Sequence, residues 1–184
     1  MKKPIIFTIG HSTRPIDEFI ELLKAHGVDE VVDVRTIPMS RHNPQFNADA
    51  LRQSLRQVKI RYKHMKKLGG LRHAKKDSTN LGWRNVSFRG FADYMGTQEF
   101  SDGLDALIKI ANIRSVAIMC AEAVPWRCHR SLIADALTKK GLAVRDIMSD
   151  AVATKHRLTS FLKIRKGKLI YPESAEETSP RFRS

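Results

Sequence analysis

The stretch SVAIMCAEAVPWRCHR, residues 115–130, carries the strongest structural signal in the chain. Residues 116–120 form a short apolar run typical of a buried strand, and residues 131–140 have the periodicity of a helix. The loop between them therefore joins a strand end to a helix start, where backbone N–H groups favour anions or thiolates. Both cysteines of the protein, Cys120 and Cys128, lie here.

The rest of the chain repeats this alternation of strands and helices. Strands are predicted at residues 4–9, 28–34, 59–62, 116–120 and 143–148, and helices at residues 16–23, 47–58, 91–95, 100–111 and 131–140. The alternation predicts an α/β fold, a single-domain layered sandwich with a mainly parallel sheet and helices on both faces. We also expect a long basic loop or lid at residues 66–90, a basic helix at 153–164 and a small edge strand at 168–171. One domain would span residues 1–172, followed by a disordered tail at 173–184.

Composition limits the class of protein. The chain has 184 residues, 42% of them hydrophobic, so it can bury one sizeable core. Its two cysteines are too few for a disulfide scaffold, and its apolar runs are too short to span a bilayer. Its start lacks the long apolar segment of a secretory signal. We therefore expect a soluble cytoplasmic protein without a membrane partner, and no cofactor is predicted.

The formal net charge of +14 indicates a polyanionic partner, such as DNA, RNA or a phosphorylated small molecule. No acidic residue occurs from residue 50 to residue 76, and aromatic residues such as Trp83, Phe88, Phe91 and Tyr94 follow soon after. A basic surface with nearby aromatics suits phosphate contacts and base stacking. The alternative is a solvated basic face with its aromatics in the core. The predicted nucleic-acid-binding residues are Arg61, Lys63, Lys66, Lys67, Arg72, Lys75 and Lys76.

Three loops, at residues 10–13, 33–35 and 120–130, are predicted to meet at one edge of the sheet. Each loop follows the carboxyl end of a predicted parallel strand, and these ends share the edge of an open sheet at which ligands bind. Cys120 is the candidate nucleophile, since helix-start N–H groups and a nearby arginine stabilise a thiolate, and Cys128 is the candidate resolving thiol. The predicted catalytic residues are Cys120, Glu122, Cys128, His129 and His11, and the predicted substrate-binding residues are Ser12, Asp33, Arg35, Ser40 and Arg130.

Two other interpretations of these loops stay open. In a structural interpretation the cysteines pack or pair without chemistry, Glu122 and Arg130 hold the loop together, and Trp126 caps the core. In a metal interpretation the cysteine, histidine and glutamate side chains of the crevice bind zinc or iron. However, two cysteines eight positions apart and followed directly by a histidine do not match the spacing of zinc ribbons, so no metal ligand is predicted.

Four motifs of the chain resemble the domain of unknown function 488 family. They are Gly10-His11-Ser12, Asp33-Val34-Arg35 with Pro38-Met39-Ser40, Tyr62 with Leu68-Gly69-Gly70, and Cys120-Ala121-Glu122 leading to Cys128-His129-Arg130. The resemblance covers residues 7–148. It implies an α/β sandwich fold and assigns no activity.

A weaker likeness is to rhodanese-type domains, which also combine an Asp-Val-Arg strand end with a later cysteine loop and a helix that begins near Arg-Ser, here Arg130-Ser131. The loop at residues 120–130 is longer than the rhodanese cradle and lacks its glycine. It also lacks the short Cys-to-Arg spacing of thiol phosphatases, so the likeness implies neither sulfur transfer nor phosphatase activity.

Three functional hypotheses follow. The favoured one is a small cytoplasmic enzyme that acts on a nucleotide or nucleic-acid-type phosphate substrate in the crevice. The first alternative is a non-catalytic DNA- or RNA-binding module, indicated by the net charge. The second is a redox or sulfur-handling thiol protein, indicated by the two cysteines.

Overall fold

Six strands form one sheet at the centre of the computed structural model, which describes residues 4–173. The strands lie in the order β3-β2-β4-β1-β5-β6 and comprise β1 (Ile5–Gly10), β2 (Glu30–Asp33), β3 (Arg61–His64), β4 (Val116–Cys120), β5 (Ala143–Ile147) and β6 (Thr154–Lys155). Neighbouring strands are parallel except for β5 and β6, which are antiparallel. The prediction of a mainly parallel sheet is therefore confirmed.

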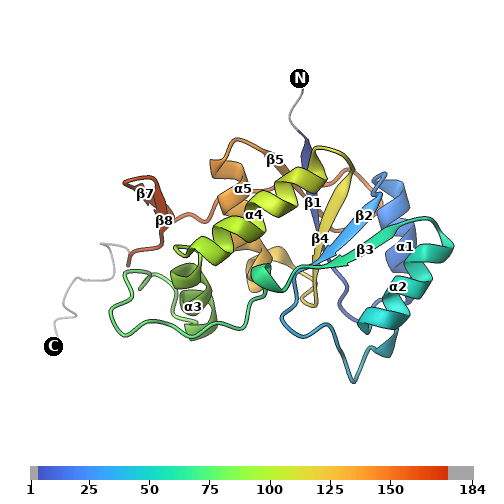
Figure 1. The fold of residues 1–184 in the computed structure, drawn as a ribbon, viewed down its shortest axis with the longest axis horizontal. Helices are drawn as coiled ribbons and strands as arrows, with labels where there is room; N and C mark the ends of the chain where they lie inside the picture. The colour runs from blue at the N-terminus through green and yellow to red at the C-terminus, as the bar shows by residue number, and fades with distance from the viewer. Residues whose placement is uncertain (1–3, 174–184) are drawn as a thin grey trace, which may run out of the picture.

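Helices cover both faces of this sheet (Figure 1). They are α1 (Ile16–Ala25), α2 (Ala48–Gln57), α3 (Val86–Tyr94), α4 (Gln98–Ala111) and α5 (Arg130–Lys139), with short 3-10 helices η1 (Pro44–Phe46), η2 (Lys66–Leu68) and η3 (Pro125–Arg127). Phe19 and Leu51 belong to the core under α1 and α2, and Leu107 and Leu132 belong to the core under α4 and α5. The layered α/β sandwich is thus confirmed. None of the described helices combines the length and the apolar character that a membrane crossing needs.

Both faces of β4 are buried, which explains why its sequence is apolar throughout. Val116, Ile118 and Cys120 belong to the core under α4 and α5, whereas Ala117 and Met119 belong to the core under α1 and α2. Successive side chains of a strand point to opposite faces, so this alternation directs the side chain of Cys120 toward α5.

The order of the strands creates a crevice around the end of β4. The helices that follow β1 and β2 lie on one face of the sheet, and those that precede and follow β4 lie on the other (Figure 1). An open α/β sheet binds its ligands at such a switch point, beyond the carboxyl ends of the strands. Here those ends are Gly10, Asp33 and Cys120.

Residues 153–164 form no helix, so that prediction is wrong. The segment contains β6, an extended loop and the start of a small hairpin. The backbone N–H of His156 donates to the carbonyl of Val144, and Asp135 accepts hydrogen bonds from His156 Nε2 (2.8 Å) and the Thr159 hydroxyl (2.7 Å). These tertiary hydrogen bonds outweigh the helical pattern of the local sequence.

The hairpin consists of β7 (Lys163–Arg165) and β8 (Lys168–Ile170), which pair with each other and not with the main sheet. The small strand predicted at 168–171 therefore belongs to a second sheet. Lys166 and Gly167 both have positive φ, as a tight turn between two strands requires. The tail predicted at 173–184 lies outside the described residues, apart from Glu173.

The loop predicted at residues 66–90 ends at Asn85, earlier than expected. The side chain of Asn85 accepts hydrogen bonds from the N–H groups of Ser87 and Phe88 and so caps the start of α3. Leu68 and Asn80 within the loop are buried. The segment therefore packs in part against the core, and its role as a lid stays a prediction.

Candidate active site

Hydrogen bonds join the loops that follow β1 and β4. The N–H of His11 donates to the carbonyl of Cys120 (3.0 Å), and the N–H of Ser12 donates to the carbonyl of Ala121 (2.8 Å). Gly10 permits this close approach, because a Cβ at that position would collide with the carbonyl of Glu122. The two loops are therefore held side by side at the mouth of the crevice.

A cluster of two thiols and one imidazole lies between β4 and α5. The Sγ atoms of Cys120 and Cys128 each lie 3.8 Å from Nδ1 of His129. Both cysteines are free thiols, and 8% of the surface of Cys120 is exposed. The structure thus brings three of the predicted catalytic side chains into contact.

Backbone carbonyls fix the protonation of the His129 ring. Nε2 lies 3.0 Å from the carbonyl oxygen of Val34 and 3.1 Å from that of Leu68. Because carbonyl oxygens only accept hydrogen bonds, Nε2 carries a proton, and in the neutral ring Nδ1 keeps a free lone pair near both sulfurs. A nitrogen placed in this way can take the proton of a thiol as a general base.

The two thiols differ in acidity. A hydrogen bond from Cys128 lowers the pKa of Cys120, and the charge of Arg130 and the N–H of Ala121 lower it further, against the opposing effect of burial. Burial raises the pKa of Cys128, and its hydrogen bond with Cys120 raises it further. Cys120 is therefore the thiol that ionises first, which is the property a nucleophile needs.

The same three side chains could hold a metal ion. Cys120 Sγ, Cys128 Sγ and His129 Nδ1 all lie within 4.8 Å of one another. Two sulfurs and one imidazole suit Zn²⁺, which takes a fourth ligand that would come from the crevice. The turn of η3 folds the loop back, so Cys128 and His129 converge on Cys120 despite the unusual spacing. A bound ion would occupy the sulfur of Cys120, the candidate nucleophile, so metal binding and thiol catalysis would exclude each other here.

Asp33 and Arg35 form a buried ion pair at the end of β2. Arg35 Nη2 lies 2.6 Å from Asp33 Oδ2, and Arg35 Nε lies 2.9 Å from Asp33 Oδ1. The Tyr62 hydroxyl also donates to Asp33 (2.8 Å), and Arg35 Nη2 donates to the carbonyl of Phe46 (2.7 Å). These contacts favour a positioning role for the pair, and its role in substrate binding stays a prediction.

His11 is a buried, neutral hydrogen-bonding group. Its Nδ1–H donates to the carbonyl of Ser12 (2.8 Å), its Nε2 accepts from Arg35 Nη1 (3.3 Å), and its ring stacks on Phe46 with centroids 4.3 Å apart. Burial and the charge of Arg35 lower the pKa of His11 to about 4. His11 is therefore uncharged at neutral pH, and its role as a proton shuttle stays a prediction.

Arg130 is almost fully buried, with 1% of its surface exposed. Its terminal nitrogens donate to the backbone carbonyls of Glu122 and Ala123, the latter over 2.8 Å. Its Nε is buried and has no hydrogen-bond partner among residues 4–173. These contacts favour a role in holding the loop around Cys120, and the predicted role as an anion clamp is not tested by them.

A cavity of about 340 Å³ opens over the thiol cluster. Ser12, Asp33 and Arg130 lie outside its lining, whereas seven of the predicted site residues line it: His11, Arg35, Ser40, Cys120, Glu122, Cys128 and His129. Most of the predicted catalytic and binding side chains therefore share one crevice.

Other residues that line this cavity are absent from the predicted catalytic and substrate-binding residues, among them Thr36 and Gly70. Gly70 leaves room for the imidazole of His129, because a Cβ at Gly70 would lie 2.5 Å from His129 Nδ1. The two adjacent glycines of the Leu68-Gly69-Gly70 motif were the available signal for such a close approach.

The basic residues expected to bind nucleic acid lie outside the cavity. Arg72 is engaged within the protein, since its guanidinium lies 3.6 Å from the ring centroid of Tyr94 and donates to the carbonyl of Gly69. Phe91 and Tyr94 belong to the core, as the alternative interpretation of the aromatics expected. The other six predicted residues are exposed: Arg61, Lys63, Lys66, Lys67, Lys75 and Lys76. None of these six residues lines the crevice.

The fold and the crevice together define a doubly wound α/β protein with a thiol and imidazole cluster at its switch point. The chain belongs to the family described as Domain of unknown function DUF488, whose model matches residues 15–137. The resemblance found in the sequence motifs is therefore confirmed. A comparison with curated proteins gave no match, and a comparison with solved structures gave none either.

Proposed function

We propose that the protein is a small enzyme that acts on a phosphate-bearing substrate of the nucleotide or nucleic-acid type, with Cys120 as its nucleophile. The position of the Cys120 sulfur carries this proposal. It lines a cavity of about 340 Å³ and lies 3.8 Å from His129 Nδ1. A nucleophile beside a base that is oriented by a third group is the arrangement of covalent catalysis.

The proposed reaction is a hydrolysis in two steps. In the first, His129 Nδ1 takes the proton of Cys120, Sγ forms a bond to the electrophilic centre, and the leaving group departs with the proton from His129. In the second, His129 takes a proton from a water molecule, the water oxygen bonds to the electrophilic centre, and the bond to Sγ breaks. The sulfur is then protonated again by His129. The carbonyls of Val34 and Leu68 hold the imidazole in the required tautomer throughout.

The charge of the molecule supports an anionic substrate. The formal net charge is +14. Arg127 lines the cavity, is exposed, and makes no side-chain hydrogen bond or ion pair within residues 4–173. A free guanidinium at the rim of a reaction crevice suits a phosphate group.

The test is turnover by the wild-type protein and by Cys120→Ser, measured on a panel of nucleoside monophosphates, nucleoside triphosphates and single-stranded oligonucleotides. We expect the substitution to lower turnover at least about a hundredfold, and mass spectrometry of quenched reactions should find the covalent adduct on Cys120. Ser54→Ala, on α2 and away from the cavity, is the matched control and should leave turnover unchanged. Full turnover by Cys120→Ser, or binding of the panel without turnover, would overturn the proposal.

A dithiol redox protein is a second candidate, favoured by the proximity of the two sulfurs. In this reaction a bond forms between the two Sγ atoms, both thiols lose a proton, and two electrons pass to an external disulfide or diamide oxidant. Treatment with diamide would then remove two hydrogens from the wild-type mass. Reversible formation of this bond without any turnover of the panel would select the redox function.

A further inference from the structure

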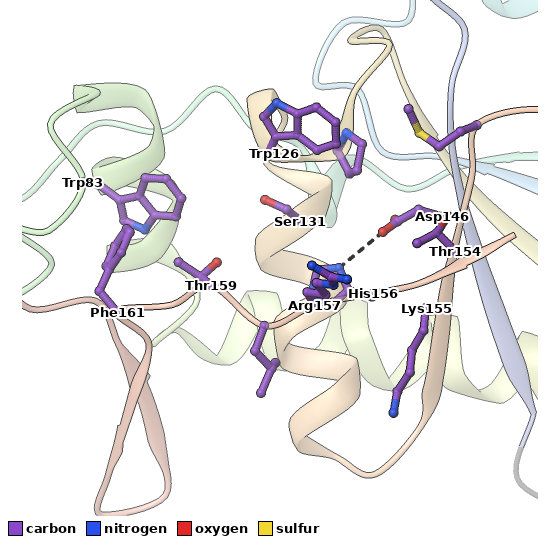
Figure 2. Close-up of a pocket in the computed structure, with 13 residues that line it drawn as sticks. Trp83, Trp126, Ser131, Asp146, Thr154, Lys155, His156, Arg157, Thr159 and Phe161 are labelled. Carbon is purple, nitrogen blue, oxygen red and sulfur yellow. Dashed lines mark ion pairs between the residues drawn. The ribbon is translucent and has the colours of Figure 1, made fainter.

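A second and larger cavity, of about 680 Å³, is lined in part by Trp126 of η3 (Figure 2), whereas the next residue, Arg127, lines the crevice of Cys120. Figure 2 shows Trp83 and Phe161 together at one end, and Trp126 apart from them near Ser131 of α5. Three large aromatic rings therefore line this cavity. A cavity of this size with aromatic walls suits a flat, partly apolar group.

Trp126 presents its ring on a rigid turn. Hydrogen bonds from Arg127 N to the carbonyl of Val124 and from Cys128 N to the carbonyl of Pro125 fix the backbone of η3. The Pro125 side chain is buried, whereas 66% of Trp126 is exposed, so Trp126 does not cap the core as the structural interpretation expected. An exposed indole at the edge of a cavity is a stacking platform for a nucleobase.

Trp83 contributes an unused hydrogen-bond donor. Its ring packs against Phe88 and Phe161, with centroids 4.7 and 4.9 Å away, and lines the cavity. Its Nε1 is buried and has no hydrogen-bond partner among the described residues. A buried donor without a hydrogen-bond partner is costly.

Positive charge lies next to this stacking platform. Arg127 follows Trp126 on the same turn and lines the crevice of Cys120, while Lys155 and Arg157 line the second cavity. All three are exposed, and none makes a side-chain ion pair within the described part of the chain. Neighbouring residues of η3 therefore present an aromatic ring to one cavity and a cation to the other.

We propose that this second cavity binds a nucleobase of single-stranded nucleic acid, stacked on Trp126, while the adjoining phosphate contacts Arg127. The strand would then pass over η3 and present its next phosphate to Cys120. This last step rests on the proposed function and names its substrate class. The binding of the base does not depend on Cys120.

The test is the affinity of a fluorescein-labelled 12-nucleotide single strand, measured by anisotropy at low salt. Trp126→Ala should weaken binding about 5- to 100-fold, and Trp126→Phe should restore part of the loss. Ile113→Ala, at an exposed apolar residue outside both cavities, is the matched control and should bind as the wild type does. Arg127→Gln should weaken binding and reduce the salt dependence by about one phosphate contact.

A second readout comes from the protein itself, whose two tryptophans are Trp83 and Trp126. Saturation with the strand should quench their fluorescence, and Trp126→Phe should remove most of the change. The same measurement with adenosine or uridine monophosphate in place of the strand shows whether a single nucleotide is enough for binding. Binding of either nucleotide that depends on Trp126 would also support stacking. Binding of Trp126→Ala within twofold of the wild type, absence of quenching, or equal affinity for duplex would overturn the proposal.

The two proposals fail independently. Trp126→Ala should weaken strand binding by the same factor in a Cys120→Ser background, because the base pocket does not include Cys120. If Trp126→Ala binds the strand as the wild type does while turnover still depends on Cys120, only the base-pocket proposal is refuted. Retention of Trp126-dependent binding without turnover would refute only the enzyme.

Discussion

Raising the pH from about 6.5 to about 9 is expected to destabilise the folded protein through a single buried histidine, His156. The residue is 8% exposed and lies in the wall of the second cavity (Figure 2). Its Nε2 lies 2.8 Å from Asp135 Oδ1, and its Nδ1 lies 3.6 Å from Asp146 Oδ2. Burial alone would lower the pKa of His156, but hydrogen bonds and charges of the two carboxylates raise it to about 9.

The size of the effect follows from that shift. The ordinary pKa is 6.5 and the folded value is about 9. Since each pKa unit corresponds to about 1.4 kcal/mol, the protonated histidine stabilises the fold by about 3 kcal/mol. The folded state holds the proton more tightly than the unfolded state. The stabilisation is therefore complete below pH 6.5 and is lost as the pH rises through 9. Tyr171 also donates to Asp135, and burial raises the pKa of Tyr171, so it stays protonated over this range.

The assay is urea unfolding of the wild type and of His156→Gln at several pH values between 6 and 9.5. We expect the difference between their free energies of unfolding to shrink by about 3 kcal/mol over this range. His42→Gln, at an exposed histidine, controls for the loss of an imidazole elsewhere. Parallel pH profiles of wild type and His156→Gln would refute the reasoning. So would an NMR titration of the wild type that places the pKa of His156 near 6.5.

Three further predictions concern the crevice. Gly70→Ala should lower turnover about a hundredfold, because its Cβ would lie 2.5 Å from His129 Nδ1 and displace the imidazole, whereas Gly96→Ala, with its nearest neighbour at 3.4 Å, should have little effect. Asp33→Asn should lower the free energy of unfolding, measured in urea, by about 3 to 5 kcal/mol, because it breaks a buried ion pair. Asp49→Asn, at a carboxylate that is 96% exposed, should change that free energy by less than about 0.5 kcal/mol. Added Zn²⁺ should inhibit turnover and a chelator should restore it, since the ion would bind both sulfurs; stimulation by Zn²⁺ would instead contradict the thiol mechanism.

The sheet and the position of the crevice were predictable because they depend on local patterns. Apolar runs separated by amphipathic segments indicate parallel strands, and the carboxyl ends of such strands meet at one edge. That rule alone predicts that Cys120, His11 and Arg35 lie together, and all three line the crevice. The alternation of side chains along β4 then determines that Cys120 faces α5.

Other features depend on contacts between distant residues, and the sequence does not reveal them. The pattern of residues 153–164 favours a helix, yet His156 bonds to Asp135, which lies 21 positions away, and the segment becomes extended. Whether Trp126 is buried or exposed depends on which side chain of η3 packs inward, and Pro125 is the one that does. The contact of His129 with Gly70 likewise joins two segments whose separation in sequence hides their proximity.

The arginines of the candidate site divide into two groups by burial, and this division bears on where the proposed substrate would be recognised. Arg35 and Arg130 are buried, and the partners of their guanidinium groups are mostly a carboxylate and backbone carbonyls. Such cations hold loops in place, because moving them would leave a buried charge unpaired. Arg127 has no such contacts within the described residues and lies at the rim of the cavity. Under the proposed function, Arg127 would therefore meet the charge of an incoming phosphate at lowest cost, while the buried Arg35 and Arg130 would hold the loops that carry Cys120 and His129.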